Sequence, residues 1–212
     1  GLETWDVSKV TNMDSMFSAA GYSATTFNLN LSNWNTSSVT DMRDMFYFTG
    51  YSATTFELKG LETWDVSKVT NMDSMFSGVG HDATTFNLNL SNWNASSVTD
   101  MNHMFSDAGY SAPTFNLNLS NWNTSSVTDM RKMFFMAGSS ATTFNLNLSN
   151  WNTSSATDMR DMFSEAGSNA TTWSVTIPKT TGSLTNTTSK WYGSSSSTYA
   201  SPLSGKSFTL AS

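Results

Sequence analysis

Apolar and polar residues alternate in a short motif that recurs along the chain. Residues 27–31 read Phe-Asn-Leu-Asn-Leu, so every second side chain is apolar. Successive side chains of a β-strand point to opposite faces, and a period of two over five or six residues is typical of a half-buried strand. The same register begins again at Phe56, Phe86, Phe115, Phe144 and Trp173. The alternation therefore predicts one strand in each copy of the motif.

A second apolar pattern lies between these strands. Residues 40–46 read Thr-Asp-Met-Arg-Asp-Met-Phe, in which Thr40 is a suitable helix N-cap. Met42, Met45 and Phe46 would lie on one face of a helix. About two helical turns are too few for a stable isolated helix. The pattern thus predicts a short helix that is held by packing its Met and Phe side chains against the sheet.

Tryptophans mark the repeat to which both patterns belong. They stand at Trp5, Trp34, Trp64, Trp93, Trp122 and Trp151. Successive positions differ by 29 residues, except for one step of 30 residues between the second and the third. One strand and one short helix in each copy of about 29 residues predict an α/β repeat solenoid. In such a solenoid the strands of successive coils stack in parallel, and the Trp, Leu, Met and Phe side chains form internal ladders.

The repeat also divides the chain. Residues 1–177 are expected to form a six-coil solenoid, whereas residues 178–212 leave the repeat. The last coil of a solenoid needs shielding, so this second segment is expected to be a C-terminal cap, with a short helix near 184–192 and a last strand near 207–211. Residues 1–18 are identical to residues 60–77. This identity indicates duplication and predicts that the chain begins in mid-repeat, with more coils upstream in the parent protein.

Composition and charge narrow the class of protein. Eight Trp, 14 Phe and 13 Met exclude a disordered linker. The net charge is −6, and ten scattered Lys and Arg provide no basic stripe for nucleic acid. No apolar run approaches the roughly 20 residues of a membrane span, so we expect no membrane insertion by this segment. The chain has no Cys, which removes disulfides and thiol catalysis.

Candidate catalytic and metal-binding residues all have a simpler explanation. His81 and His103 stand at positions that vary between copies, which favours exposed polar residues. Asp41 and Asp44 suit helix capping, and the Met-x-x-Met pairs recur at core spacing. We therefore expect no enzyme, no catalytic residue, no cofactor and no metal ligand. Calcium bound by Asp and Asn ladders stays open, although no Gly/Asp-rich nonapeptide is present.

The outward face of the predicted strands is the first candidate binding surface. It is polar and almost uncharged, and its candidate residues are Asn28, Asn30, Asn87, Asn89, Asn116, Asn118, Asn145 and Asn147. These amides could bond to sugar hydroxyls or a peptide backbone, or order water against ice. Alternatively, the Asn side chains form ladders with one another on a solvated face.

A second candidate surface lies where the copies differ. Its apolar members are Tyr47, Phe48, Tyr51, Phe135 and Met136. Apolar side chains at variable positions are typical of a contact patch. They could equally pack beneath the Gly-Tyr-Ser-Ala-Thr-Thr insertion.

The Trp-led segment resembles a known repeat. Residues 34–46, Trp-Asn-Thr-Ser-Ser-Val-Thr-Asp-Met-Arg-Asp-Met-Phe, are similar to the signature of the BspA-like leucine-rich repeat surface proteins, whose usual module is the mycoplasma lipoprotein-associated repeat of unknown function. The resemblance covers about residues 1–177. It implies a leucine-rich-repeat-like right-handed coil, export to a bacterial surface, and a role in adhesion or host interaction. It supplies no catalytic or ligand residues.

These observations favour a non-catalytic, surface-exposed binding or adhesion module of a bacterial surface protein. Its location would be secreted or cell-surface, and its partner a protein or glycan of a host or neighbouring cell. A structural spacer or stalk is the alternative. Ice binding or glycan binding through the Asn/Ser ladder is a further one, although ice binders usually show a regular Thr array and Glu57 and Lys59 interrupt the Asn ladder.

Overall fold

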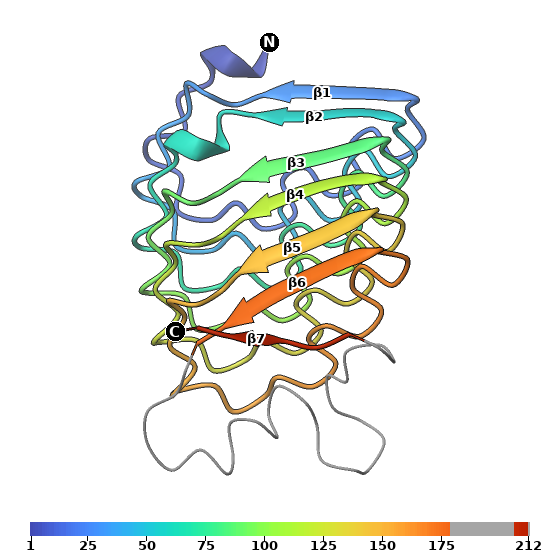
Figure 1. Ribbon diagram of the computed structural model, residues 1–212. Coiled ribbons are helices and arrows are strands. Elements are labelled where there is room, and N and C mark those ends of the chain that lie inside the picture. Colours follow the sequence, from blue (N-terminus) through green and yellow to red (C-terminus); the bar gives the residue numbers. More distant parts are fainter. Residues whose placement is uncertain (179–205, 212) are drawn as a thin grey trace.

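The computed structural model describes residues 1–178 and 206–211. There the chain forms a parallel β-solenoid, in which each coil of about 29 residues adds one strand to a stack (Figure 1). The strands are β1 (Thr26–Asn30), β2 (Thr55–Lys59), β3 (Thr85–Asn89), β4 (Thr114–Asn118), β5 (Thr143–Asn147), β6 (Thr172–Ile177) and β7 (Thr209–Leu210). The prediction of one parallel strand in each copy is confirmed.

The strand expected near residues 207–211 is β7, which pairs in parallel with β6. Phe208 packs at the end of the core, with its ring 5.2 Å from Phe163 and 5.4 Å from Trp173. The helix expected near residues 184–192 lies outside the described residues.

The predicted short helix in each copy is wrong. The only helices among the described residues are two 3₁₀ turns, η1 (Leu2–Thr4) and η2 (Leu61–Thr63). In the Met-rich segment Asp44 and Phe48 both have φ near 52°, a left-handed conformation that interrupts a right-handed helix. The equivalent residues have positive φ in all six copies: Ser15, Ala19, Ser74, Gly78, His103, Asp107, Lys132, Met136, Asp161 and Glu165.

Hydrogen bonds between coils take the place of helical ones in this segment. The N–H of Met42 donates to the carbonyl oxygen of Asn71 (3.0 Å), and the N–H of Phe46 donates to that of Met75 (2.9 Å). Every second N–H closes a turn within its own coil instead, as the N–H of Met45 does on the carbonyl of Met42 (3.3 Å). The spacing of the Met and Phe residues is therefore explained by burial of their side chains inside a ladder of stacked turns, and not by a helix.

Aromatic ladders run through the core along the solenoid axis. The rings of Trp64 and Trp93 stack with centroids 6.3 Å apart, and those of Phe76 and Phe105 stack at 5.4 Å. The indole N–H also fixes a coil to the preceding one, as the Nε1–H of Trp93 does on the carbonyl of Leu61 (2.7 Å); Trp34, Trp64, Trp122 and Trp151 donate in the same way. The expected internal ladders are confirmed.

Hydroxyl groups join the coils on the polar side. The Oγ1–H of Thr99 donates to the carbonyl of Thr70 (3.1 Å), and Thr128 repeats this contact on Thr99 (3.1 Å). Ser97 and Ser126 form an equivalent column (2.7 Å to each carbonyl). Much of the Ser and Thr content is thus structural.

The sheet is interrupted between β2 and β3. The strands form one sheet of β1 and β2 and a second of β3 to β7. The interruption coincides with the 30-residue copy, whose additional residue lies at the end of β2, where Gly60 has φ 90° and is followed by η2. A Cβ at Gly60 would lie 2.2 Å from the backbone nitrogen of Ser32, so only glycine fits there.

Candidate functional site

The outward face of the sheet carries three columns of polar side chains. The burial pattern of β3, β4 and β5 alternates so that the first, third and fifth residues are exposed. The first column is an uninterrupted row of threonines: Thr26, Thr55, Thr85, Thr114, Thr143 and Thr172. This column is outside the predicted site, although the alternation that predicts the strand extends one residue back, to Thr26.

The second column contains half of the predicted Asn residues: Asn28, Asn87, Asn116 and Asn145. Glu57 takes this position in β2, and Ser174 takes it in β6. These four Asn are exposed, and their side chains have no hydrogen-bond partner within the described residues. Their amides are therefore free to bind a ligand.

The third column contains the other predicted residues, and it has a structural role. The Oδ1 of Asn30, Asn89, Asn118 and Asn147 accepts the N–H of the Ser two residues later, at 3.1 to 3.2 Å. These Asx turns end β1, β3, β4 and β5 and direct the chain to the next Trp. No Asn-to-Asn side-chain hydrogen bond joins neighbouring strands in the described chain. The columns thus differ in their intramolecular hydrogen bonds although the residue type is the same, and Asn89 and Asn118 of the third column also line the depression described next.

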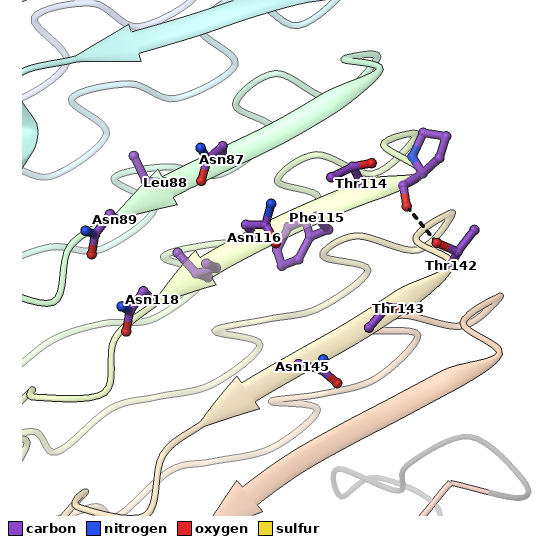
Figure 2. Close-up of a pocket in the computed structure, with 12 residues that line it drawn as sticks. Asn87, Leu88, Asn89, Thr114, Phe115, Asn116, Asn118, Thr142, Thr143 and Asn145 are labelled. Carbon is purple, nitrogen blue, oxygen red and sulfur yellow. Dashed lines mark hydrogen bonds between the residues drawn. The ribbon is translucent and has the colours of Figure 1, made fainter.

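A shallow depression of about 560 Å³ lies over β3, β4 and β5 (Figure 2). Asn87, Asn116 and Asn145 line it, together with Thr114 and Thr143 of the threonine column. No charged residue lines it. The depression can hold a neutral, polar ligand that both accepts and donates hydrogen bonds.

A second depression, of about 670 Å³, lies where β2 and β3 are not paired. It is lined by the charged residues Glu57 and Lys59 of β2 and by Glu62 of η2. Lys59 Nζ lies 2.8 Å from Glu57 Oε1, so the two form an ion pair. Asn87 and Asn89 complete its far side. Ligand contacts at this depression would include charge, unlike those at the first.

The predicted variable patch is two separate groups. In the first, the rings of Tyr47 and Phe48 lie 4.2 Å apart and those of Phe48 and Tyr51 lie 5.1 Å apart. Phe48 packs over Gly78 of the next coil, where a Cβ would lie 2.1 Å from its ring. All three are half-buried.

The second group belongs to the fifth copy, three coils away. Phe135 and Met136 are half-buried there. Lys132 Nζ lies 5.0 Å from the centre of the Phe135 ring, a cation–π contact. The five residues therefore do not form one continuous surface.

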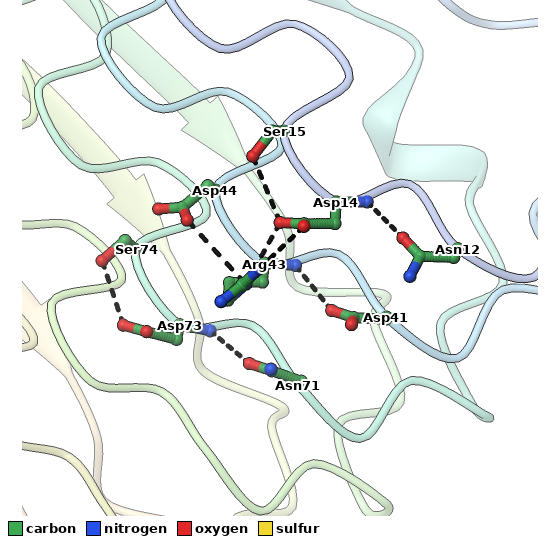
Figure 3. Close-up of polar contacts among 9 residues, drawn as sticks. All are labelled: Asn12, Asp14, Ser15, Asp41, Arg43, Asp44, Asn71, Asp73 and Ser74. Atoms are coloured by element: carbon green, nitrogen blue, oxygen red, sulfur yellow. Dashed lines mark hydrogen bonds and ion pairs between the residues drawn. The ribbon is translucent and has the colours of Figure 1, made fainter.

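A column of Asx residues stands directly before the Met-rich turns, and Figure 3 labels Asn12, Asp41 and Asn71 of this column. Its members are Asn12, Asp41, Asn71, Asp100, Asp129 and Asp158, joined by backbone bridges. Each accepts, through Oδ1, the N–H of the residue two positions later; Asp41 does so for Arg43 at 3.0 Å. Burial raises the pKa of Asp100 and Asp129 above the usual range.

Arg43 connects two coils beside this column. Its Nη2 lies 2.8 Å from Oδ2 of Asp14, and this hydrogen bond lowers the pKa of Asp14. Asp44 is nearby, and burial raises its pKa. The acidic groups are thus used in turns and ion pairs, and no group of three His, Asp or Glu side chains in the described ranges could hold a metal ion.

Neither His is fully exposed. His81 stacks between Tyr51 and Tyr110, with centroids 4.3 and 4.7 Å away, and its Nδ1 lies 2.7 Å from Asp82 Oδ1. His103 is half-buried, and burial lowers its pKa. The expectation of exposed histidines is wrong, because the stacked turns cover both rings. Within residues 1–178 and 206–211, neither has a nucleophile as a hydrogen-bond partner.

Comparison with known proteins identifies one family. A sequence profile described as a Mycoplasma protein of unknown function, DUF285, matches residues 1–51, 47–176 and 109–195. No curated protein and no solved structure matches the chain. No helix among the described residues is long and apolar enough to span a membrane.

Proposed function

The chain belongs to the DUF285 family of Mycoplasma proteins of unknown function, and we propose that it is a non-catalytic binding module whose ligand lies on the outward strand face. The observation that carries the proposal is the column of Asn28, Asn87, Asn116 and Asn145. These amides are exposed and their side chains have no hydrogen-bond partner in the described chain; Asn87, Asn116 and Asn145 lie on neighbouring strands of one sheet and line the first depression.

The chemistry of this face supports a neutral, hydroxyl-rich or amide-rich ligand. An Asn side chain offers two donors and one acceptor oxygen, and a Thr hydroxyl offers both functions. Both columns recur at the spacing of parallel strands, about 4.8 Å, on a scaffold fixed by backbone hydrogen bonds. Glycans and extended peptide backbones present groups of this kind. The proposed partner is accordingly a glycan or protein of a host or neighbouring cell.

The proposed location is the bacterial surface, either secreted or anchored. Its support is the resemblance of residues 34–46 to the repeat of BspA-like leucine-rich repeat surface proteins. By this resemblance we also propose a role in adhesion. A structural spacer or stalk is the competing proposal. It is favoured by the third Asn column, since those side chains are used in Asx turns.

Binding to a glycan array and to host matrix proteins tests the proposal. The triple variant Asn87→Ala, Asn116→Ala and Asn145→Ala should fold normally and bind its ligand at least tenfold more weakly. The matched control is Ser125→Ala with Ser154→Ala, because these side chains also have no hydrogen-bond partner within the described residues and stand outside the strands. If wild type and triple variant are equally silent on both arrays, the spacer is the better description.

The threonine column supports a second candidate function, ice binding. Its six residues occupy one position in six consecutive strands without interruption, whereas the Asn column is interrupted by Glu57. Thermal hysteresis of the purified chain tests this directly. Replacing Thr85, Thr114 and Thr143 with Val should change the hysteresis if this column orders water, and absence of any hysteresis in wild type would remove this candidate.

A further inference from the structure

The two depressions of the strand face meet over β3. The residues that line both of them are Asn87, Leu88 and Asn89. The first depression continues from there over β4 and β5, and the second continues over β2, so together they form one shallow groove that crosses the strands. Figure 2 shows Asn87, Asn116 and Asn145 on three successive strands of this groove. An elongated ligand that runs along the solenoid axis can therefore contact both depressions.

The spacing of the free side chains limits which kind of chain fits the groove. Asn87, Asn116 and Asn145 recur at the strand spacing, about 4.8 Å. An extended peptide that crosses the strands turns equivalent groups to one side only at intervals of about 6.6 Å, so it cannot contact each Asn in the same way. A linear chain of β-1,4-linked pyranose rings repeats at a length close to the strand spacing and has hydroxyl groups on both edges of every ring. A linear glycan is thus the better match.

Charge enters the groove at one end. The charged residues that line it are Glu57, Lys59 and Glu62, and all three belong to the second depression. Lys59 Nζ lies 2.8 Å from Glu57 Oε1, so these two charges offset each other. The side chain of Glu62 is exposed and has no hydrogen-bond or ion-pair partner in the described part of the chain. The groove therefore has one unbalanced negative charge, at its β2 end.

This charged end coincides with the one change in the length of the repeat. Residues 56–62 read Phe-Glu-Leu-Lys-Gly-Leu-Glu, whereas residues 86–92 of the next copy read Phe-Asn-Leu-Asn-Leu-Ser-Asn. The Phe and Leu residues of the motif are kept, and the polar residues between and after them become charged. The difference between the two copies is thus mainly one of surface chemistry, on the face that carries the free Asn column.

We propose that the groove binds a linear β-1,4-linked glycan with free amino groups, that is, an unacetylated amino-sugar polymer. Hydroxyl groups of the chain bond to Asn87, Asn116 and Asn145, and a protonated amine at the β2 end pairs with Glu62. An ammonium group offers three donors and no acceptor, so it matches a free carboxylate. The inference rests on the proposed function, because it names the ligand class of the same face.

Three tetrasaccharides that differ only at C2 test this inference: the β-1,4-linked tetramers of glucose, of N-acetylglucosamine and of glucosamine. Titration calorimetry at pH 6 should show that the glucosamine tetramer binds about threefold more tightly than the glucose tetramer, a difference typical of one exposed ion pair. The acetylated tetramer adds bulk at C2 without charge, and it should bind no more tightly than the glucose tetramer.

Two variants should change this preference in opposite directions. Glu62→Gln should remove it and leave the affinity for the glucose tetramer unchanged. Lys59→Gln should increase it, because the variant releases the carboxylate of Glu57. The matched control is Glu3→Gln, since Glu3 stands in an identical Leu-Glu-Thr turn and lines neither depression, while the net charge changes by the same amount.

The outcomes separate this inference from the proposed function. Equal affinity of the wild type for the glucose and glucosamine tetramers, or an equal effect of Glu3→Gln and Glu62→Gln, overturns the inference. The proposed function then stands if the triple Asn→Ala variant at residues 87, 116 and 145 binds the glucose tetramer more weakly. Binding of none of the tetramers also overturns the inference, and the array and matrix-protein result then decides the proposed function by itself. Tetramer binding that the triple variant leaves unchanged contradicts both.

Discussion

At the scale of single residues, the Oδ1 of an Asn or Asp fixes each turn of the Asx column before the Met-rich segments. A neutral Asn does this as well as a charged Asp. Asp100 Oδ1 accepts the N–H of Asn102 at 2.9 Å, and Asn71 makes the same contact to Asp73 at 2.9 Å one coil earlier. Burial raises the pKa of Asp100, so the folded state disfavours the carboxylate relative to the unfolded chain. The sequence shows that both Asn and Asp occur in this column, but only the structure shows which of them is buried.

Asp100→Asn should therefore stabilise the protein at pH 7, by roughly 1 kcal/mol or less since the group is partly solvated. A carboxyl with a raised folded-state pKa destabilises the fold once pH rises above its unfolded-state pKa. The gain should accordingly disappear near pH 3, where the carboxyl is protonated in both states. Urea unfolding at several pH values measures this. Asp158→Asn is the opposite control, because Arg160 lowers the pKa of Asp158 and the variant should lose stability at pH 7.

Glycine is required at position 138 for two reasons: the left-handed backbone conformation and the lack of space for a Cβ. It has φ 53°, and a Cβ there would lie 2.7 Å from Cγ of Phe115. Gly138→Ala should cost about 2–4 kcal/mol, the sum of a left-handed alanine and an overpacked core. Thermal unfolding measures the change. Asp161→Gly is the control, since Asp161 has φ 56° and glycine adopts that conformation freely; a loss of similar size in both variants would contradict the explanation.

At the scale of elements, the strands are predictable and the Met-rich segment is not. Residues 27–31 alternate with a period of two in any context, so the sequence alone predicts β1 and its inward Phe and Leu. Residues 40–46 have helical spacing, yet their N–H groups bond to the next coil. A helix prediction considers bonds within the segment, whereas here bonds between segments 29 residues apart determine the conformation. The Met and Phe side chains that the predicted helix would bury are nevertheless the ones that the observed stacked turns bury.

Met104 tests this view of the Met-rich segment. It is fully buried, so Met104→Asp places an unpaired charge in the core and should cost at least about 4 kcal/mol. Met104→Leu, which conserves volume and polarity, should cost less than about 1.5 kcal/mol. Circular dichroism and urea unfolding compare the two variants. If Met104→Asp is as stable as Met104→Leu, the segment is not part of the core.

At the scale of the whole molecule, the sequence predicts the polar face but not how it is divided. The repeat places Asn28 and Asn30 in equivalent surroundings, and both belong to the predicted site. The structure separates them, because the chain turns after Asn30 and its Oδ1 accepts the N–H of Ser32. The free column is therefore a consequence of the turn, and Thr26 joins the face by the same strand geometry. The sequence alone therefore cannot predict which Asn column has free side chains, because this depends on the turn that follows Asn30.

The interruption of the sheet predicts where the stack opens first. Coils of a solenoid contact only their neighbours, so stability is close to a sum over interfaces. The interface of β2 with β3 lacks the strand pairing that β5 shares with β6 over five residue pairs, although Phe56 still stacks on Phe86 at 6.3 Å. Native-state hydrogen exchange should therefore be faster for the amides of β3 that face β2 than for the amides of β6 that face β5. Equal protection at both places would mean that the aromatic and Met-rich ladders alone hold the coils together, and that the charged depression over Glu57 and Lys59 is as rigid as the rest of the face.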